Sequence, residues 1–281
     1  MSSLYIGLSQ WSHPTWPGQL ISSHRKNTEY LLDYAKVFNA VEGNTSFYGV
    51  PDTASLLRWD AQTPANFRFT FKFPATVSHQ GQLADNITPA LSFIEQLAPL
   101  REKLGMLMLQ LPAACGPEQL AGLAQLLRAL PSDLEYGVEV RHPAFFAKQE
   151  AERALNRLLI EHKVNRIIMD SRPVFSCPPT SAALADAQQK KPQVPVHIIS
   201  TGHSPLVRFI GHPVPDYNFP FWQPWLARIQ DWLKEGKSVY VFVHTADIEF
   251  SPQLAAQIAA ALNHPLPPFP GQAPSPQGQL F

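Results

Sequence analysis

Polar and charged side chains follow directly on a series of short apolar runs in this sequence. They are Glu42 with Asn44, Lys72, Gln110, Glu139 with Arg141 and His142, Asp170 with Arg172, Arg208 with His212, and His244 with Asp247. A buried, unpaired charge costs several kcal/mol, so groups in this number must pair with one another or bind a polar ligand if the fold brings them together.

The mixture of signs in this set predicts a site for an anionic substrate together with an acid–base pair. The predicted catalytic residues are Glu42, Lys72, Glu139 and Asp170. Glu139 or Asp170 is expected to act as the general acid or base, and the cations to stabilise the anion and the transition state. Further contacts to a small anionic or sugar-like substrate are expected from Asn44, Gln110, Arg141, His142, Arg208 and His244.

Aromatic side chains follow the first and second apolar runs. Segment 11–16 (WSHPTW) offers two indoles and an imidazole, and Phe47 and Tyr48 follow the second run. Rings of this kind stack on planar or sugar-like ligands. The predicted ligand wall consists of Trp11, His13, Trp16 and Tyr48. The alternative is that these rings simply pack within the protein, as loop tryptophans more often do.

Two other interpretations of the charged set stay open. In the first, Glu139 pairs with Arg141 and Asp170 pairs with Arg172, and the charges form a structural ion network. In the second, they bind a metal, because carboxylates and an imidazole from four runs suit manganese, magnesium or zinc. Lysine and arginine side chains beside such a cation oppose it, so no metal is predicted.

Two motifs that would specify other chemistry are missing from the sequence. No G-x-G-x-x-G follows the first apolar run, and there is no G-x-S-x-G nucleophile elbow. No cofactor is therefore predicted, and a cofactor-independent hydrolase or isomerase fits the polar set best.

The elements that must position these residues alternate along the chain. Apolar runs of strand character lie at 4–9, 38–42, 67–73, 105–111, 136–141, 164–170, 206–211 and 238–244. Helical spacing of apolar residues occurs at 30–37, 91–104, 120–130, 151–162 and 222–234. Near-continuous runs such as GMLMLQL indicate parallel strands covered on both faces. We predict an α/β fold, a closed (β/α)8 TIM-like barrel, rather than a doubly wound open sheet.

Two stretches do not fit the alternation. Residues 171–205 are too long for an ordinary connection and predict an elaborated loop over the top of the barrel, of the kind that forms lids. Residues 264–281 are rich in proline and lack acidic, Lys and Arg side chains. The prediction is therefore one barrel domain, 1–263, followed by a flexible, disordered tail, 264–281.

Composition limits the class of protein. Of 281 residues, 45% are hydrophobic, and 22 Lys and Arg balance 22 Asp and Glu. A large core is expected, and neutrality argues against direct nucleic-acid binding by the body of the protein. Two distant cysteines, no basic leader and no window of about 18 apolar residues predict a cytoplasmic protein without membrane contact.

Six ordered segments carry a family resemblance. WSHPTWPG, FNAVEGNTSFYGVP, FTFKFP, LGMLMLQLP, YGVEVRHPAFF and VYVFVHTAD, between about Tyr5 and Leu262, resemble the YecE-like family, domain of unknown function 72. The resemblance implies a TIM barrel and a cytoplasmic, mostly bacterial protein, and names no reaction. The family's polar positions fall on Trp11, Glu42, Asn44, Phe47, Tyr48, Lys72, Gln110, Glu139, Arg141, His142 and Asp170. The chain departs at Gly43, where the family has a bulky aliphatic residue, and at 244–247, where it has an Asn pair.

The last five residues suggest a different function. Gln277, Leu280 and Phe281 form a Q-x-x-L-F peptide, which resembles the motif that docks bacterial repair and replication proteins on the sliding clamp. Two large apolar residues at the end of a polar tail gain by burial in a partner. An accessory protein of DNA metabolism and a non-catalytic ligand-binding barrel are thus the alternatives to an enzyme.

Overall fold

The computed structural model describes residues 2–272, and its strands form a closed parallel barrel in chain order. The strands are β1 Leu4–Leu8, β2 Ala40–Gly43, β3 Arg68–Lys72, β4 Leu104–Gln110, β5 Glu135–Glu139, β6 Asn165–Asp170, β7 Leu206–Gly211 and β8 Val239–Thr245. Every predicted run is a strand, and β8 pairs with β1 to close the ring. The prediction of a (β/α)8 barrel is confirmed.

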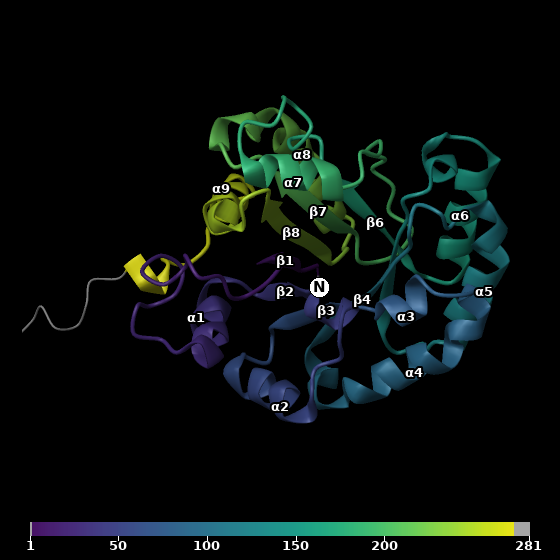
Figure 1. Cartoon of the computed structure of the whole chain (residues 1–281), viewed down its shortest axis with the longest axis horizontal. Coiled ribbons are helices and arrows are strands. Elements are labelled where there is room, and N and C mark those ends of the chain that lie inside the picture. The colour runs from purple at the N-terminus through teal and green to yellow at the C-terminus, as the bar shows by residue number, and fades with distance from the viewer. Residues whose placement is uncertain (1, 273–281) are drawn as a thin grey trace, which may run out of the picture.

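Helices surround the strands in the order of the chain (Figure 1). They are α1 Tyr30–Val37, α2 Thr53–Gln62, α3 Ala75–Ser78, α4 Ile87–Gln96, α5 Leu120–Ala129, α6 Glu150–Glu161, α7 Ala182–Lys190, α8 Phe219–Lys234 and α9 Ser251–Ala261. The five predicted helices are present, with the second divided into α4 and a 3₁₀ turn at Ala98–Lys103. The sequence analysis missed α2, α3, α7 and α9. Their apolar stripes are short or made of alanine, so periodicity is weak there.

Side chains alternate between the lumen and the helices along each strand, because successive residues of a strand face opposite sides. Tyr5 and Tyr240 stack in the lower lumen, with ring centroids 4.6 Å apart. Above them lies a small apolar layer that includes Met106, Ile167 and Phe242. Apolar side chains thus fill the lower part of the lumen. The next lumen-facing residues, two positions further along each strand, form its upper end.

The first part of the predicted elaborated loop, residues 171–197, lies over the C-terminal end of the barrel and the gap between β5 and β6, and we call it the lid; residues 198–205 run back to the N-terminal ends of β5 and β6. Helix α7 lies in this segment and places Leu184 and Ala187 against Met169 of β6 and Ile210 of β7. By the alternation of side chains along the strands, Met169 and Ile210 face the lumen. β5 and β6 share only two register pairs, and the extended residues 192–197 lie over the pocket between these strands. The prediction of an elaborated loop over the barrel is confirmed.

Residues 264–272 differ from the flexible tail expected from composition. Phe269 is buried and Leu266 packs on the main core. Gly271 lies so close to the backbone of Gln19 and Ile21 that a β-carbon there would be 2.4 Å from two carbonyl oxygens. Figure 1 shows this C-terminal segment beside the loop that follows β1. Proline removes donors without preventing packing, which is why composition alone suggested a free chain here.

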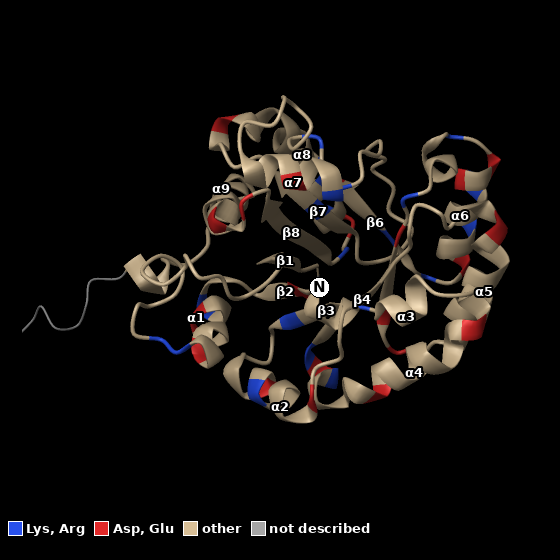
Figure 2. Cartoon of the chain, in the orientation of Figure 1, with Lys and Arg blue, Asp and Glu red and all other residues tan. Residues whose placement is uncertain are grey.

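Charges of both signs are interspersed over the outer helices, with no belt of a single sign in the part of the chain that the structure describes (Figure 2). None of the helices within residues 2–272 is both long and apolar enough to cross a bilayer.

Candidate active site

Six polar side chains from six strands meet at the upper end of the lumen, and we call them the mouth cluster. Its members are Glu42 (β2), Lys72 (β3), Gln110 (β4), Glu139 (β5), Arg208 (β7) and His244 (β8). All six are buried. Each lies at or near the carboxyl end of its strand, and these ends converge in a parallel barrel. The structure therefore brings together these six residues, which were selected from the sequence because they end or nearly end a strand.

Arg208 is the centre of the mouth cluster. Its Nε and Nη2 donate to the two carboxylate oxygens of Glu42, at 2.8 and 2.7 Å, and its Nη1 donates to Glu139 Oε2. The second oxygen of Glu139 accepts from Nε and Nη2 of Arg141, at 2.9 and 2.8 Å. Bidentate guanidinium pairs of this kind fix geometry as well as charge. The guanidinium of Arg208 thus occupies the place between two carboxylates that a metal would need.

The two carboxylates stay ionised at neutral pH. Burial alone would raise the pKa of Glu139, but the charges of Arg208 and Arg141 overcome it and lower the pKa to about 2. Burial would likewise raise the pKa of Glu42, but the interactions with Arg208 and His244 outweigh this effect. The pKa of Glu42 therefore lies well below its ordinary value. A general acid or base works best with a pKa near the operating pH. The predicted role of Glu139 as acid or base is therefore not supported by its surroundings, which make it a fixed negative charge.

Lys72 is the member of the cluster whose protonation changes near neutral pH. Its Nζ donates to Gln110 Oε1 at 2.8 Å and lies 4.0 Å from Glu42 Oε1. Burial lowers the pKa of Lys72 to about 7, and the charge of Arg208 adds to this effect while Glu42 opposes it. Both the amine and the ammonium are populated in the cell's pH range, so Lys72 is the group able to exchange a proton.

His244 completes the cluster from β8. Burial lowers its pKa to about 4, although the Glu42 carboxylate acts in the opposite direction. The ring is thus neutral at pH 7, and its Nε2 lies 3.3 Å from Glu42 Oε2. We assign the proton to Nε2, since the carboxylate can only accept. The histidine that stands near the family's usual Asn pair therefore contacts the same carboxylate as Arg208.

Lys191, directly after α7, belongs to the mouth although the sequence analysis did not select it. Burial lowers its pKa, and the charge of Arg208 lowers it further while Glu42 and Glu139 oppose. No hydrogen bond or ion pair of its side chain occurs within residues 2–272. The signal that could have found it is its place in a long connection above the barrel. His79, after α3, also faces the mouth, since burial lowers its pKa and Arg141 and Lys72 lower it further.

Asp170 does not join the mouth cluster. It follows lumen-facing Met169 and so lies on the outer side of β6, where its Oδ2 accepts from Trp225 Nε1 of α8 at 2.8 Å. Arg172 donates to both carboxylate oxygens, at 2.9 and 2.7 Å. The pairing with Arg172 that the structural alternative named is therefore present, and the predicted catalytic role of Asp170 has no geometric support.

Asp170→Asn tests this placement. The change removes the charge that faces Arg172 but keeps an acceptor for the Trp225 indole. We expect denaturant unfolding to show a loss of about 1–3 kcal/mol, which is typical of hydrogen bonds to charged groups. Binding of anions to the mouth should stay within a factor of about two, because the affected contacts face α8. A variant that keeps its stability but no longer binds anions would put Asp170 back in the site.

The predicted aromatic wall is largely part of the core. Trp16 is fully buried, and Trp11 packs edge-on against Trp59 of α2, with centroids 4.8 Å apart. His13 bonds Thr15 through Nδ1 at 2.8 Å, beside the Trp16 ring. Packing within the protein, the alternative given for these rings, accounts for both tryptophans, because the loop after β1 folds onto α2 and the C-terminal segment.

Tyr48, His142 and Asn44 have separate roles around the mouth. Tyr48 is 89% exposed, next to Phe47, whose ring meets His79 edge-on at 5.0 Å. His142 Nδ1 accepts from the Ala144 backbone at 3.2 Å and so caps the turn after β5. Asn44 donates to the Ser9 carbonyl at 2.9 Å, and its buried Oδ1 has no partner among the described residues. Tyr48 and Asn44 thus remain available to a ligand, and His142 serves the local turn.

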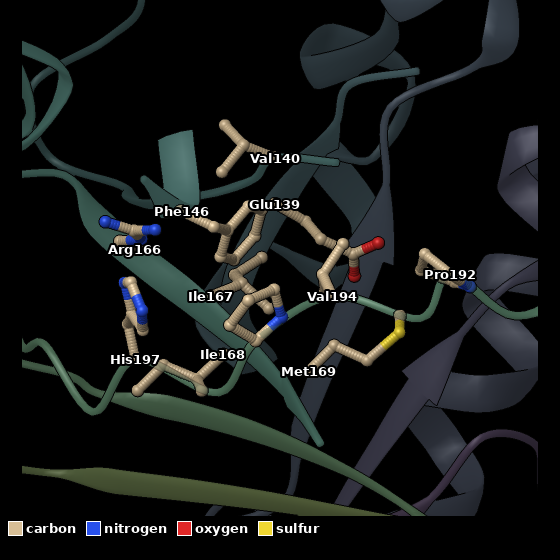
Figure 3. A pocket seen from close by; sticks show the side chains of 11 residues that line it. Glu139, Val140, Phe146, Arg166, Ile167, Ile168, Met169, Pro192, Val194 and His197 are labelled. Atoms are coloured by element: carbon tan, nitrogen blue, oxygen red, sulfur yellow. The ribbon is translucent and has the colours of Figure 1, made fainter. Parts of the chain in front are cut away.

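A narrow pocket separates the lid from the gap between β5 and β6 (Figure 3). The Glu139 carboxylate and Pro192 lie toward one end, and Arg166 and His197 lie toward the other. Its volume is about 10 Å³, room for a single water molecule. Within residues 2–272, no three His, Cys, Asp or Glu side chains are arranged to hold a metal ion.

Comparison with known proteins places this chain in a family. A profile described as "Protein of unknown function DUF72" matches residues 5–280. This chain belongs to the DUF72 family. The UPF0759 protein YecE of Escherichia coli K12 is 46% identical over 264 residues, 94% of this chain and 94% of YecE.

Solved structures of DUF72 proteins share the barrel. A DUF72 family protein from Enterococcus faecalis V583 has a TM-score of 0.70 at 21% identity, with 92% of this chain and 95% of that chain covered. One from Thermotoga maritima MSB8 has a TM-score of 0.67 at 22% identity, with 93% and 99% covered. At these identities the likeness establishes the fold.

One departure of this DUF72 chain from the family pattern has a packing reason. A β-carbon on Gly43 would lie 2.4 Å from Phe71 Cδ1 and 3.2 Å from the Thr70 carbonyl. The Phe71 ring of β3 therefore fills the space that a bulky aliphatic residue on β2 needs. The predicted clamp-docking residues of the DUF72 chain, Gln277, Leu280 and Phe281, lie outside the described residues and stay a prediction.

Proposed function

We propose that this protein is an enzyme of hydrolase or isomerase type that binds a small anionic substrate at the rim of the mouth cluster, where Arg141 is partly exposed, and uses Lys72 to transfer protons. The observation that carries the proposal is the charge balance of the mouth. Four cations, Lys72, Arg141, Lys191 and Arg208, face two carboxylates, Glu42 and Glu139. Arg208 engages both carboxylates and Arg141 engages the second oxygen of Glu139, so the four cations exceed the two carboxylates and neither Lys72 nor Lys191 has a carboxylate within hydrogen-bond distance among the described residues.

Each residue has a distinct role in the proposal. Glu42, Glu139 and Arg208 form a fixed ionic layer that holds Lys72 and Arg141 in place. Arg141, whose side chain is 21% exposed, and Lys191 bind the anionic group of the substrate. Lys72 takes up or releases a proton in the reaction, a step that commonly contributes about 10²–10⁴-fold to rate. Carboxylates that remain charged stabilise the arrangement of cations without competing for the proton.

Anion binding by purified protein tests the proposal. We expect inorganic phosphate, glycerol 3-phosphate and pyruvate to raise the melting temperature, and calorimetry to show one site. Affinity for pyruvate, whose charge is constant in this range, should increase as pH falls through 7, because Lys72 gains its proton there. Lys191→Gln should weaken phosphate binding by about tenfold, the loss of one charge-assisted contact.

Lys190→Gln is the matched control, because Lys190 is adjacent to Lys191 but 71% exposed and paired with Asp186. It changes the net charge equally and should leave phosphate affinity unchanged. Equal affinities of Lys191→Gln and Lys190→Gln would overturn the assignment of the mouth as the anion site.

A further inference from the structure

The amino group of Lys72 has few hydrogen-bond partners among the described residues. The side chain is 10% exposed, and Gln110 Oε1 is the acceptor within hydrogen-bond distance of Nζ among the described residues. The nearest carboxylate oxygen, on Glu42, is 4.0 Å away and is already bonded to Arg208. An ammonium has three donors to satisfy, whereas the neutral amine has two and a lone pair. The surroundings of Lys72 thus suit an amine with an available lone pair.

Lys103 is a buried lysine of the same chain whose amino group has a full set of hydrogen-bond and ion-pair partners. Its side chain is 12% exposed, close to the value for Lys72. Its Nζ donates to the carbonyls of Asp60 and Thr63, at 2.6 and 2.8 Å, and lies 2.8 Å from the Asp60 carboxylate. Burial is therefore the same for the two lysines, and the number of partners is what sets Lys72 apart.

The neighbours of Lys72 favour attack on a carbonyl compound that carries a negative charge. Nearby cations hold a lysine amine in its nucleophilic form, and here the charges of Arg208 on β7 and of Arg141, just after β5, both act on Lys72. The same Arg141, together with Lys191, would hold a carboxylate or phosphate close to the amine. We propose that Lys72 forms an imine with small carbonyl compounds that carry a carboxylate or phosphate group. This inference rests on the proposed function for the anion site and adds the substrate class and the covalent step.

The step is balanced within the mouth. The Lys72 lone pair attacks the carbonyl carbon, the C=O π bond breaks, and a proton passes from the attacking nitrogen to the oxygen to give a neutral carbinolamine. The hydroxyl then takes a proton from solvent and leaves as water while the nitrogen lone pair forms the C=N bond, so each protonated imine formed consumes one proton and releases one water. The protonated imine carries a positive charge at the position of Nζ, where the Glu42 carboxylate at 4.0 Å stabilises it.

Reductive trapping tests the inference. The full chain is incubated at pH 7 with pyruvate and sodium cyanoborohydride, which reduces the imine to a stable secondary amine. Intact-mass analysis should show one adduct, and peptide mapping of the wild-type protein should place it on Lys72. Acetone, which lacks the negative charge, should label at least about tenfold more slowly, since it loses the charge-assisted contacts.

Two variants make the result specific. Lys72→Arg keeps the charge but cannot form an imine, and its labelling should fall below a tenth of the wild-type level. Lys103→Arg changes an equally buried lysine and should label as the wild type does. Adducts spread over surface lysines to the same extent in wild type and Lys72→Arg would overturn the inference.

Comparison with phosphate binding separates the inference from the proposed function. If phosphate binds in a Lys191-dependent manner but pyruvate leaves no adduct on Lys72, the imine is overturned and the anion site stands. If Lys72 is labelled but Lys191→Gln binds phosphate like Lys190→Gln, the imine stands and the anion assignment fails. Failure of both measurements overturns both.

Discussion

Arg208→Met should lower the free energy of unfolding by about 3–5 kcal/mol, the cost of leaving buried charges without their partner. The variant strands Glu42 and one oxygen of Glu139 in the closed mouth, where each accepts from Arg208 in the wild type. In melting temperature this loss corresponds to a fall on the order of 10 °C for a chain of this size. Denaturant unfolding at pH 7 measures it directly.

Two further variants and a pH series identify the cause. Arg141→Met removes the other guanidinium from Glu139, but that side chain is partly exposed, so a loss of only about 1 kcal/mol is expected. Adding Glu42→Gln to Arg208→Met should restore part of the stability, because it removes the stranded charge. The wild type loses the contribution of Glu139 as pH falls from 4.5 to about 2, so its advantage over Arg208→Met shrinks there. A deficit below about 1 kcal/mol at pH 7 would contradict the buried network.

Lys72→Met should change stability in the opposite direction. Burial lowers the pKa of Lys72 from 10.5 to about 7, so the folded state binds the proton less tightly than the unfolded state. The cost of the charged lysine is complete below pH 7 and is relieved as pH rises from 7 to 10.5. After allowing for the acceptor lost at Gln110, we expect Lys72→Met to be more stable than wild type by about 1–3 kcal/mol at pH 6. The difference should close toward pH 10.

Lys103→Met is the matched control for Lys72→Met. Lys103 is equally buried but fully paired, so its replacement should destabilise the protein at every pH in the series. If Lys72→Met were also destabilised at pH 6, Lys72 would be a structural partner of Glu42 rather than a strained functional group. A residue that serves chemistry at the expense of stability is expected to behave as predicted here.

The barrel and most of its mouth could be predicted because the relevant signals are local. Strands such as β4 are near-continuous apolar runs, which are typical of parallel sheets, and a polar residue that ends such a run lies at one end of the barrel. Glu42, Lys72, Glu139 and Arg208 were found by this rule.

The rule failed where the direction of a side chain, rather than its place in the chain, decides its role. Asp170 ends a strand as Glu139 does, but the register places it on the outer face, and neighbouring residues of a strand face opposite sides. Trp16 is in the expected loop and points into the core. Lys191 is in a segment without periodicity, and only the packing of α7 brings it over the lumen. Long-range packing determines the positions of Trp16 and Lys191, and the register of β6 determines that of Asp170.

The pairing at the mouth also bears on how the chain folds. Glu42 and Arg208 are separated by 166 residues, and Glu42 and His244 by 202. These contacts cannot form until β2, β7 and β8 lie in one closed ring, and such distant contacts come late because closing long loops is slow. Interactions that form after the rate-limiting step leave the folding rate unchanged and slow unfolding instead. We therefore expect the ionic layer to lower the unfolding rate, and so to extend the lifetime of the folded barrel, while leaving the folding rate unchanged.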